Sequence, residues 1–272
     1  MPTAETAAAS AGAVEPAAGR RGQPALELSS VRLAYGGLVA LAGVDLTVHA
    51  GRVSGLIGPN GAGKTSLFDV VTGVTRPSAG RVLLHGRDVT RSRPASRARL
   101  GLGRTFQRLE LFSSLTVREN VAVAAEAADP VRLRPTPWHH VESQARRVVD
   151  EQLARVGLSA HASARVDTLS TGTARLVEVA RALATRPTVL LLDEPASGLD
   201  PSETDRLASL LLALAADGIA VLLVEHDVEL VMRVCSEIVV LDRGSVLAAG
   251  LPSVVRQQPA VVEAYLGQMA VS

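Results

Sequence analysis

The chain has 272 residues, of which 47% are hydrophobic and 20% charged, so it suits one large globular domain or two small ones. Its 28 basic and 27 acidic side chains leave a net charge of +1, which argues against a nucleic-acid-binding protein. The single cysteine, Cys235, excludes an intrachain disulfide, and no apolar run reaches the roughly 20 residues of a membrane-spanning helix.

The first part of the chain reads as a tail followed by closely spaced strands. Residues 1–24 are Ala-rich, lack the apolar stretch of a secretory signal and are predicted to be disordered, ahead of a domain over 25–268. Alternation of apolar and polar residues then predicts strands. These strands and the helix among them are expected over 25–35, 44–49, 52–57, 64–73 (the helix) and 79–89. Such dense strands indicate an antiparallel sheet beside a strand–loop–helix unit.

The middle of the chain, about residues 108–186, is predicted to be a helical subdomain. Helical spacing covers 116–128 and 138–157, and the Pro-containing segment 129–137 is predicted to be the loop between them. Four apolar residues share one face of the second helix: Val141, Ala145, Val148 and Val156.

Strands and helices alternate after residue 186, which predicts a parallel sheet with right-handed crossovers in an α/β fold. Buried strands are expected over 188–193 and 219–225. Between them, Asp200, Pro201 and Glu203 form the start of a capped helix, with Glu203 closing a capping box. A hairpin is expected over 237–250, followed by two short C-terminal helices over about 251–268 that Pro259 separates.

The sequence GPNGAGKT, residues 58–65, fits the phosphate-loop pattern G-x-x-x-x-G-K-[ST]. Its glycines let backbone N–H groups surround a polyphosphate, and the helix that follows points its positive end at the anion. Lys64 is the only lysine of the chain, which indicates a position where Arg cannot replace an ammonium. The alternative is a Gly-rich turn without a ligand. The residues predicted to bind nucleotide here are Gly58, Pro59, Asn60, Gly61, Ala62, Gly63, Lys64, Thr65 and Ser66.

Two carboxylates end the buried strand LLLDEP. In a phosphate-loop protein, Asp193 would hold Mg²⁺ through water together with the Thr65 hydroxyl, and Glu194 would act as the general base on the attacking water. The alternative reading is an acidic turn at a strand end, which Asp and Pro commonly make.

With these motifs in order, the chain resembles the ATP-binding subunits of ABC transporters over residues 26–267. The resemblance implies a P-loop NTPase (RecA-like) core that binds ATP and Mg²⁺. It also implies that Tyr35 stacks on adenine and that Gln107 reaches Mg²⁺ and the water. His226 is expected to contact the γ-phosphate, although an isolated His is more often structural. Ser170 and Gly172 would face the ATP held by a partner subunit.

Within that family, the stretches RTFQRLELFSSLTVRENVAVA and VLLVEHDVELVMRVCSEIVVLDRGSVLAAG are similar to the importers of branched-chain amino acids. This implies a peripheral protein on the cytoplasmic face of the membrane. Its partners would be a second ATP-binding subunit, two membrane permeases and, indirectly, an extracytoplasmic substrate-binding protein. Alternatives are another cargo, such as urea, short amides or an exported lipid, and a soluble ABC protein that acts on DNA or ribosomes.

Some residues carry separate expectations. Thr173 stands where the family usually has Gln. The second ATP-binding subunit would make a homodimer or a heterodimer, and in a heterodimer the ATP capped by LSTGT (the signature segment, residues 169–173) is predicted to be the weaker hydrolytic site. Cys235 is expected in the core, and a metal site at His139 and His140 is not expected. A solvated face is expected for the arginines 91, 93, 97 and 99, and the alternative is a contact with permease or lipid headgroups.

Overall fold

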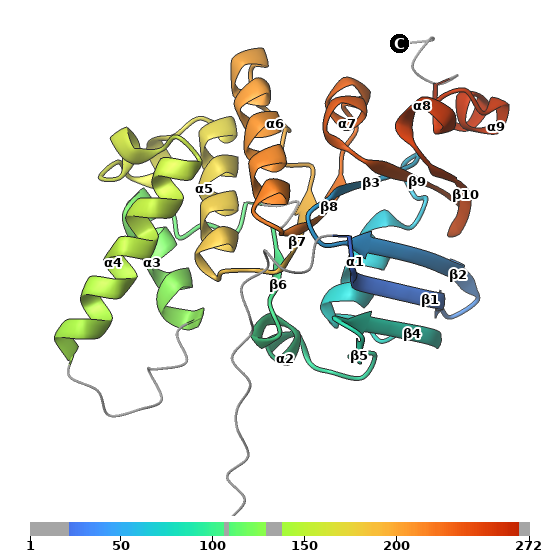
Figure 1. Ribbon diagram of the computed structural model, residues 1–272, viewed down its shortest axis with the longest axis horizontal. Helices are drawn as coiled ribbons and strands as arrows, with labels where there is room; N and C mark the ends of the chain where they lie inside the picture. Colours follow the sequence, from blue (N-terminus) through green and yellow to red (C-terminus); the bar gives the residue numbers. More distant parts are fainter. Residues whose placement is uncertain (1–21, 106–108, 129–137, 267–272) are drawn as a thin grey trace, which may run out of the picture.

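The computed structural model describes residues 22–105, 109–128 and 138–266. Residues 1–21 of the predicted tail, the predicted loop over 129–137 and Gln107 lie outside the described residues, as do the side chains of residues 138–144. The described part forms two sheets and a group of helices to one side (Figure 1).

The larger sheet has the strand order β10-β9-β3-β8-β7-β6, and five of its strands are parallel neighbours, as the α/β pattern predicted. Only the terminal pair β9 and β10 is antiparallel, and it is the predicted hairpin. The strands are β3 (Val53–Ile57), β6 (Leu102–Arg104), β7 (Val189–Asp193), β8 (Ala220–Val224), β9 (Glu237–Asp242) and β10 (Ser245–Gly250).

The smaller sheet is antiparallel, with the order β2-β1-β4-β5, and it lies beside the strand–loop–helix unit as expected. Its strands are β1 (Pro24–Tyr35), β2 (Leu38–His49), β4 (Ala79–Leu84) and β5 (Arg87–Asp88). Strand β2 begins earlier than the sequence indicated, because it pairs with β1 right up to their turn, where Tyr35 faces Leu38.

Helices cover the larger sheet, and α3 and α4 pack on α5, which itself contributes to the core under β7 (Figure 1). The helices are α1 (Lys64–Thr72), α2 (Pro94–Arg99), α3 (Val117–Ala128), α4 (Trp138–Arg155), α5 (Thr171–Ala184), α6 (Pro201–Ala216), α7 (Val228–Val234), α8 (Pro252–Val255) and α9 (Pro259–Val261), with short 3₁₀ turns at Ser159–His161 and Val166–Thr168 and a π-helical turn, η5 (Val262–Leu266), after α9. Pro259 begins α9, because the first helical position needs no N–H donor.

The larger sheet separates two apolar cores. Along β7, Leu190 and Leu192 pack into the core shared with α5 and α6, whereas Val189 and Leu191 face the core of the smaller sheet and α1. Successive side chains of a strand point to opposite faces, so a strand buried on both faces must be apolar throughout. The capping box at Asp200 and Glu203 is present, and Cys235 is buried, both as predicted.

The prediction of a solvated face for the arginines was wrong at Arg97, whose side chain is 1% exposed. Its Nη1 donates to the carbonyls of Val70 and Val71, at 2.6 Å each, at the end of α1. Nε and Nη2 donate to the carbonyls of Ser92 and Thr90. The last carbonyls of a helix lack intrahelical partners, so the guanidinium replaces water there. Burial lowers the pKa of Arg97 to about 10, which leaves it charged at neutral pH.

Replacing Arg97 by Met is expected to lower the free energy of unfolding by about 3 kcal/mol, because buried carbonyls lose their donor. For a domain of this size, the loss corresponds to a fall in Tm of about 6–12 °C. Thermal unfolding followed by circular dichroism measures it, and Arg99→Met is the matched control on the exposed side of the same helix. Equal Tm values for the two variants would contradict the capping role.

Candidate functional site

The phosphate loop lies between the buried strand β3 and helix α1. Gly63 is the N-cap of α1 with a φ of 105°, so the helix begins at Lys64 with its N-terminus pointing into the loop. A Cβ on Gly58 would lie 2.1 Å from the carbonyl oxygen of Leu241, and one on Gly63 would lie 2.7 Å from that of Ala40. The close approach of backbone from β2 and β9 is the physical reason why both positions are glycine.

Lys64 lies inside this loop with only 9% of its surface exposed. Its Nζ donates to the carbonyl oxygens of Gly58, at 2.6 Å, and Pro59, at 3.0 Å. Burial lowers the pKa of Lys64, and the charges of Glu194 and Asp193 act in the opposite direction. The ammonium therefore lies within the electrostatic reach of both predicted carboxylates.

Asp193 is the last residue of β7 and is 4% exposed. Its N–H donates to Thr105 Oγ, at 3.2 Å, and its Oδ2 lies 3.7 Å from Nη2 of Arg104. Burial raises the pKa of Asp193, and Arg104 opposes that effect. Oδ2 is buried without a hydrogen-bond partner among the described residues, so this atom is available to a ligand in the site.

Glu194 and His226 meet across neighbouring parallel strands. Glu194 follows β7 in a left-handed conformation, with φ at 49°, and its N–H donates to Val224 O. This turn directs its side chain to His226, which follows β8, and Oε1 lies 2.9 Å from the ring Nε2. A non-Gly residue with positive φ is strained, and such strain collects at functional sites. The carboxyl ends of β3, β7 and β8 thus bring Lys64, Asp193, Glu194 and His226 to one sheet edge.

The remaining predicted nucleotide ligands differ in their exposure. Tyr35 is 50% exposed at the end of β1, and Thr65 is exposed while Ser66 is half-buried in the first turn of α1. Gln107 lies outside the described residues, although Thr105, two residues before it, is held by Asp193.

The signature segment leads into α5, with Ser170 as its N-cap. Ser170 Oγ accepts the N–H of Thr173, at 3.1 Å, and lies 2.9 Å from the Thr173 hydroxyl. Gly172 packs against the loop after β7, where a Cβ would lie 2.8 Å from the carbonyl oxygen of Gly198. The structure therefore places Thr171 and Gly172 beside the loop 196–200, and the Thr173 hydroxyl contacts the Ser170 side chain that caps its own helix.

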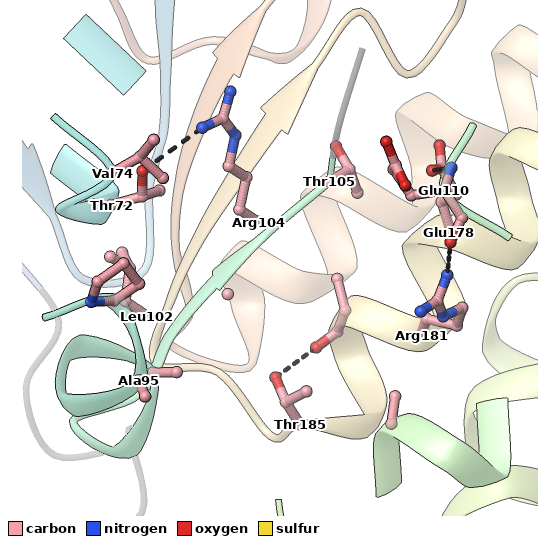
Figure 2. A pocket seen from close by; sticks show the side chains of 15 residues that line it. Thr72, Val74, Ala95, Leu102, Arg104, Thr105, Glu110, Glu178, Arg181 and Thr185 are labelled. Carbon is pink, nitrogen blue, oxygen red and sulfur yellow. Dashed lines mark hydrogen bonds between the residues drawn. The ribbon is translucent and has the colours of Figure 1, made fainter. Parts of the chain in front are cut away.

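A cavity of about 380 Å³ lies beside the site, between α2, β6, α3 and α5 (Figure 2). Thr105 and Glu110 are both part of its wall. Both backbone polar groups of Glu110 are held by α5: its N–H donates to Glu178, at 2.9 Å, and its carbonyl accepts from Arg181. The segment after Gln107 is thereby attached to the helix that the signature segment begins.

Sequence reasoning missed three buried groups at the site: Arg104, Thr105 and Glu225. Each contacts the backbone or side chain of a residue far away in the chain. A charged residue in or next to an apolar strand is the signal that could have indicated Arg104 and Glu225.

The geometry of these residues fits a nucleotide and a divalent cation. The loop offers N–H groups where only glycine fits, and a buried ammonium faces it. Among the described residues, Asp193 Oδ2 is a buried carboxylate oxygen that accepts no hydrogen bond, and oxygen is the ligand that Mg²⁺ prefers.

Comparison with known proteins agrees with this geometry. Residues 41–197 match the profile of the ABC transporter family. The chain is 40% identical, over 90% of its length and 99% of the relative, to the high-affinity branched-chain amino acid transport ATP-binding protein BraF of Pseudomonas aeruginosa. It is 37% identical over the same shares to LivG of Escherichia coli, which bears the same description. The crystal structure of a nucleotide-free ATP-binding cassette from an ABC transporter superposes with a TM-score of 0.79 at 30% identity, over 89% of this chain and 99% of that one.

Proposed function

Since this chain belongs to the ABC transporter family of ATP-binding proteins, we propose that it is the ATP-hydrolysing subunit of an importer for branched-chain or related amino acids. The observation that carries the ATPase role is the meeting of Lys64, Asp193, Glu194 and His226 at one sheet edge. The cargo rests on the 40% identity to a branched-chain amino acid transport protein over nearly the whole chain.

The reaction is ATP + H₂O to ADP and phosphate. Lys64 binds the β- and γ-phosphates with the N–H groups of residues 58–65, and Tyr35 stacks on the adenine. Glu194 takes the proton of the attacking water, and His226, 2.9 Å from Glu194 Oε1, orients that carboxylate and contacts the γ-phosphate. Mg²⁺, when bound, neutralises phosphate charge, and Thr65, Asp193 and Gln107 would hold it, Asp193 through water.

Two chains complete the sites in this proposal. Ser170 and Gly172 of one subunit face the ATP bound to the phosphate loop of the other, since N–H groups at a helix N-terminus suit a phosphate. Loss of the γ-phosphate then favours opening of the dimer. In this proposal, a permease segment would contact the chain at the 380 Å³ cavity beside Thr105. The wall of this cavity contains Glu110 and Glu178, whose hydrogen bond attaches the segment after Gln107 to α5.

No helix in the described ranges is long and apolar enough to cross a membrane. From its likeness to ATP-binding proteins of transporters, we place the chain at the cytoplasmic face of the membrane as a peripheral subunit. Two permeases and a second ATP-binding subunit are its direct partners, and an extracytoplasmic substrate-binding protein is its indirect partner.

Proteoliposomes that contain the chain, its two permease partners and their substrate-binding protein test the cargo. ATP-dependent uptake of radiolabelled leucine, isoleucine or valine, and stimulation of ATP hydrolysis by the same amino acids, are the expected results. Uptake of urea or of a short amide without leucine uptake would refute the amino-acid cargo and leave the ATPase role standing. Absence of ATP hydrolysis in the assembled complex would refute both.

Thr173→Gln is expected to raise ATP hydrolysis or to tighten ATP-dependent dimerisation. Gln extends beyond the Ser170 hydroxyl that holds Thr173, so its amide can reach the ATP of the partner subunit. Steady-state hydrolysis and size-exclusion chromatography with ATP measure the two effects. Thr168→Gln, an exposed substitution just before the signature segment, is the control. Unchanged hydrolysis and unchanged dimerisation in Thr173→Gln would contradict the weaker-site prediction.

A further inference from the structure

Glu225 is a buried carboxylate that the proposed mechanism does not use. It follows β8 directly and is 3% exposed. A carboxylate is costly to bury unless hydrogen bonds replace its water, so its retention here needs a specific reason. Burial raises the pKa of Glu225, while backbone N–H groups of Ala196, His226 and Asp227 act to lower it.

The two oxygens of Glu225 hold two different segments of the site. Oε1 accepts the N–H of Ala196, at 2.7 Å, and Oε2 accepts the N–H of His226, at 3.1 Å. Ala196 lies two residues after Glu194, and His226 is the residue whose ring contacts Glu194. One carboxylate thus connects the turn after β7 to the turn after β8, the two turns that carry Glu194 and His226.

The held turn continues to the signature segment. After Ala196 the loop reaches Gly198, whose carbonyl oxygen would lie 2.8 Å from a Cβ on Gly172. A Cβ on Gly198 would in turn lie 3.3 Å from Cγ2 of Thr171. Glu225 therefore contacts both His226 and the loop 196–200, and this loop contacts the start of α5. That helix start would cap the ATP of the partner subunit.

We infer that Glu225 is a positioning residue that keeps His226 against Glu194 and, through Ala196, fixes the loop on which Gly172 rests. This inference rests on the proposed roles of Glu194, His226 and Gly172. It assigns to one buried side chain the connection between a subunit's own hydrolytic groups and the ATP that it caps for its partner.

Two substitutions separate the two contacts. In Glu225→Gln, the amide oxygen still accepts the N–H of Ala196. The amide NH₂ then faces the N–H of His226, and since both groups are donors, no hydrogen bond forms between them. We expect kcat for ATP hydrolysis to fall about tenfold with KM nearly unchanged, and Tm to fall by less than in Glu225→Ala, which removes the acceptor of both N–H groups. Glu225→Ala releases both segments, so it should lower kcat further and also weaken ATP-dependent dimerisation. Glu229→Gln, exposed on α7, is the matched control.

A double-mutant cycle with His226→Ala tests the route. If Glu225 acts through His226, the variant with Glu225→Gln and His226→Ala hydrolyses ATP no more slowly than His226→Ala alone. Independent, multiplicative losses would overturn the inference, as would wild-type kcat in Glu225→Gln. An equal loss of Tm and kcat in both Glu225 variants would also overturn it, since it would indicate a structural role only. Wild-type turnover in His226→Ala would instead refute the proposed role of His226, which is a distinguishable failure.

Discussion

The variant Glu194→Gln is expected to bind ATP with near wild-type affinity and to hydrolyse it at least about 100-fold more slowly. Gln has the same shape and can follow the same turn, whose N–H bond to Val224 O does not involve the side chain. It also keeps an oxygen for the contact with His226. What it loses is the ability to accept a proton from water, so only the chemical step should change.

Equilibrium binding of a fluorescent ATP analogue and steady-state phosphate release measure the two quantities separately. Without turnover, the dimer that encloses ATP should persist, so size-exclusion chromatography with ATP should show more dimer for Glu194→Gln than for the wild type. Glu229→Gln, which changes an exposed carboxylate in the same way, should behave like the wild type. Hydrolysis by Glu194→Gln at the wild-type rate would reject the base assignment.

The variant Lys64→Arg is expected to lose ATP affinity by about 100-fold or more, although it keeps the positive charge. The Lys64 ammonium is 9% exposed, and its Nζ lies within 3.0 Å of two carbonyl oxygens of the loop. A guanidinium is larger and planar, so it cannot take the position of Nζ between these two carbonyl oxygens. Its charge would move away from the phosphates.

Isothermal titration with ATP and thermal unfolding together test this prediction. The Tm of Lys64→Arg should change little compared with its ATP affinity, because the loop is at the edge of the core. Arg99→Lys, an exchange of the same two residue types at an exposed position, should alter neither. Wild-type ATP affinity in Lys64→Arg would show that any positive side chain at this position is sufficient for ATP binding. It would then reject the interpretation that position 64 needs an ammonium.

Local sequence patterns were enough to predict several parts of this protein. The apolar runs of β7 and β8, the capping box at Asp200 and the phosphate loop each consist of residues that are neighbours in the sequence, so a local pattern shows them. The same is true of the helix that starts at Lys64, since its cap is the residue before it. The α/β fold followed from the alternation of such local elements.

Tertiary structure alone decided which of these local elements meet. Strand β6 has three residues and forms because it pairs with β7. A segment this short has no alternation of apolar and polar residues from which a strand could be predicted. Arg97 is buried because the end of α1, 26 residues earlier in the chain, needs donors. Glu225 faces Ala196 across 29 positions because β7 and β8 are neighbours in the sheet. The sequence by itself determined the chemistry of each motif, since that depends on residue type and short spacing; the order of the strands determined which motifs act on the same phosphate, since only the packed sheet brings distant chain segments within hydrogen-bond distance.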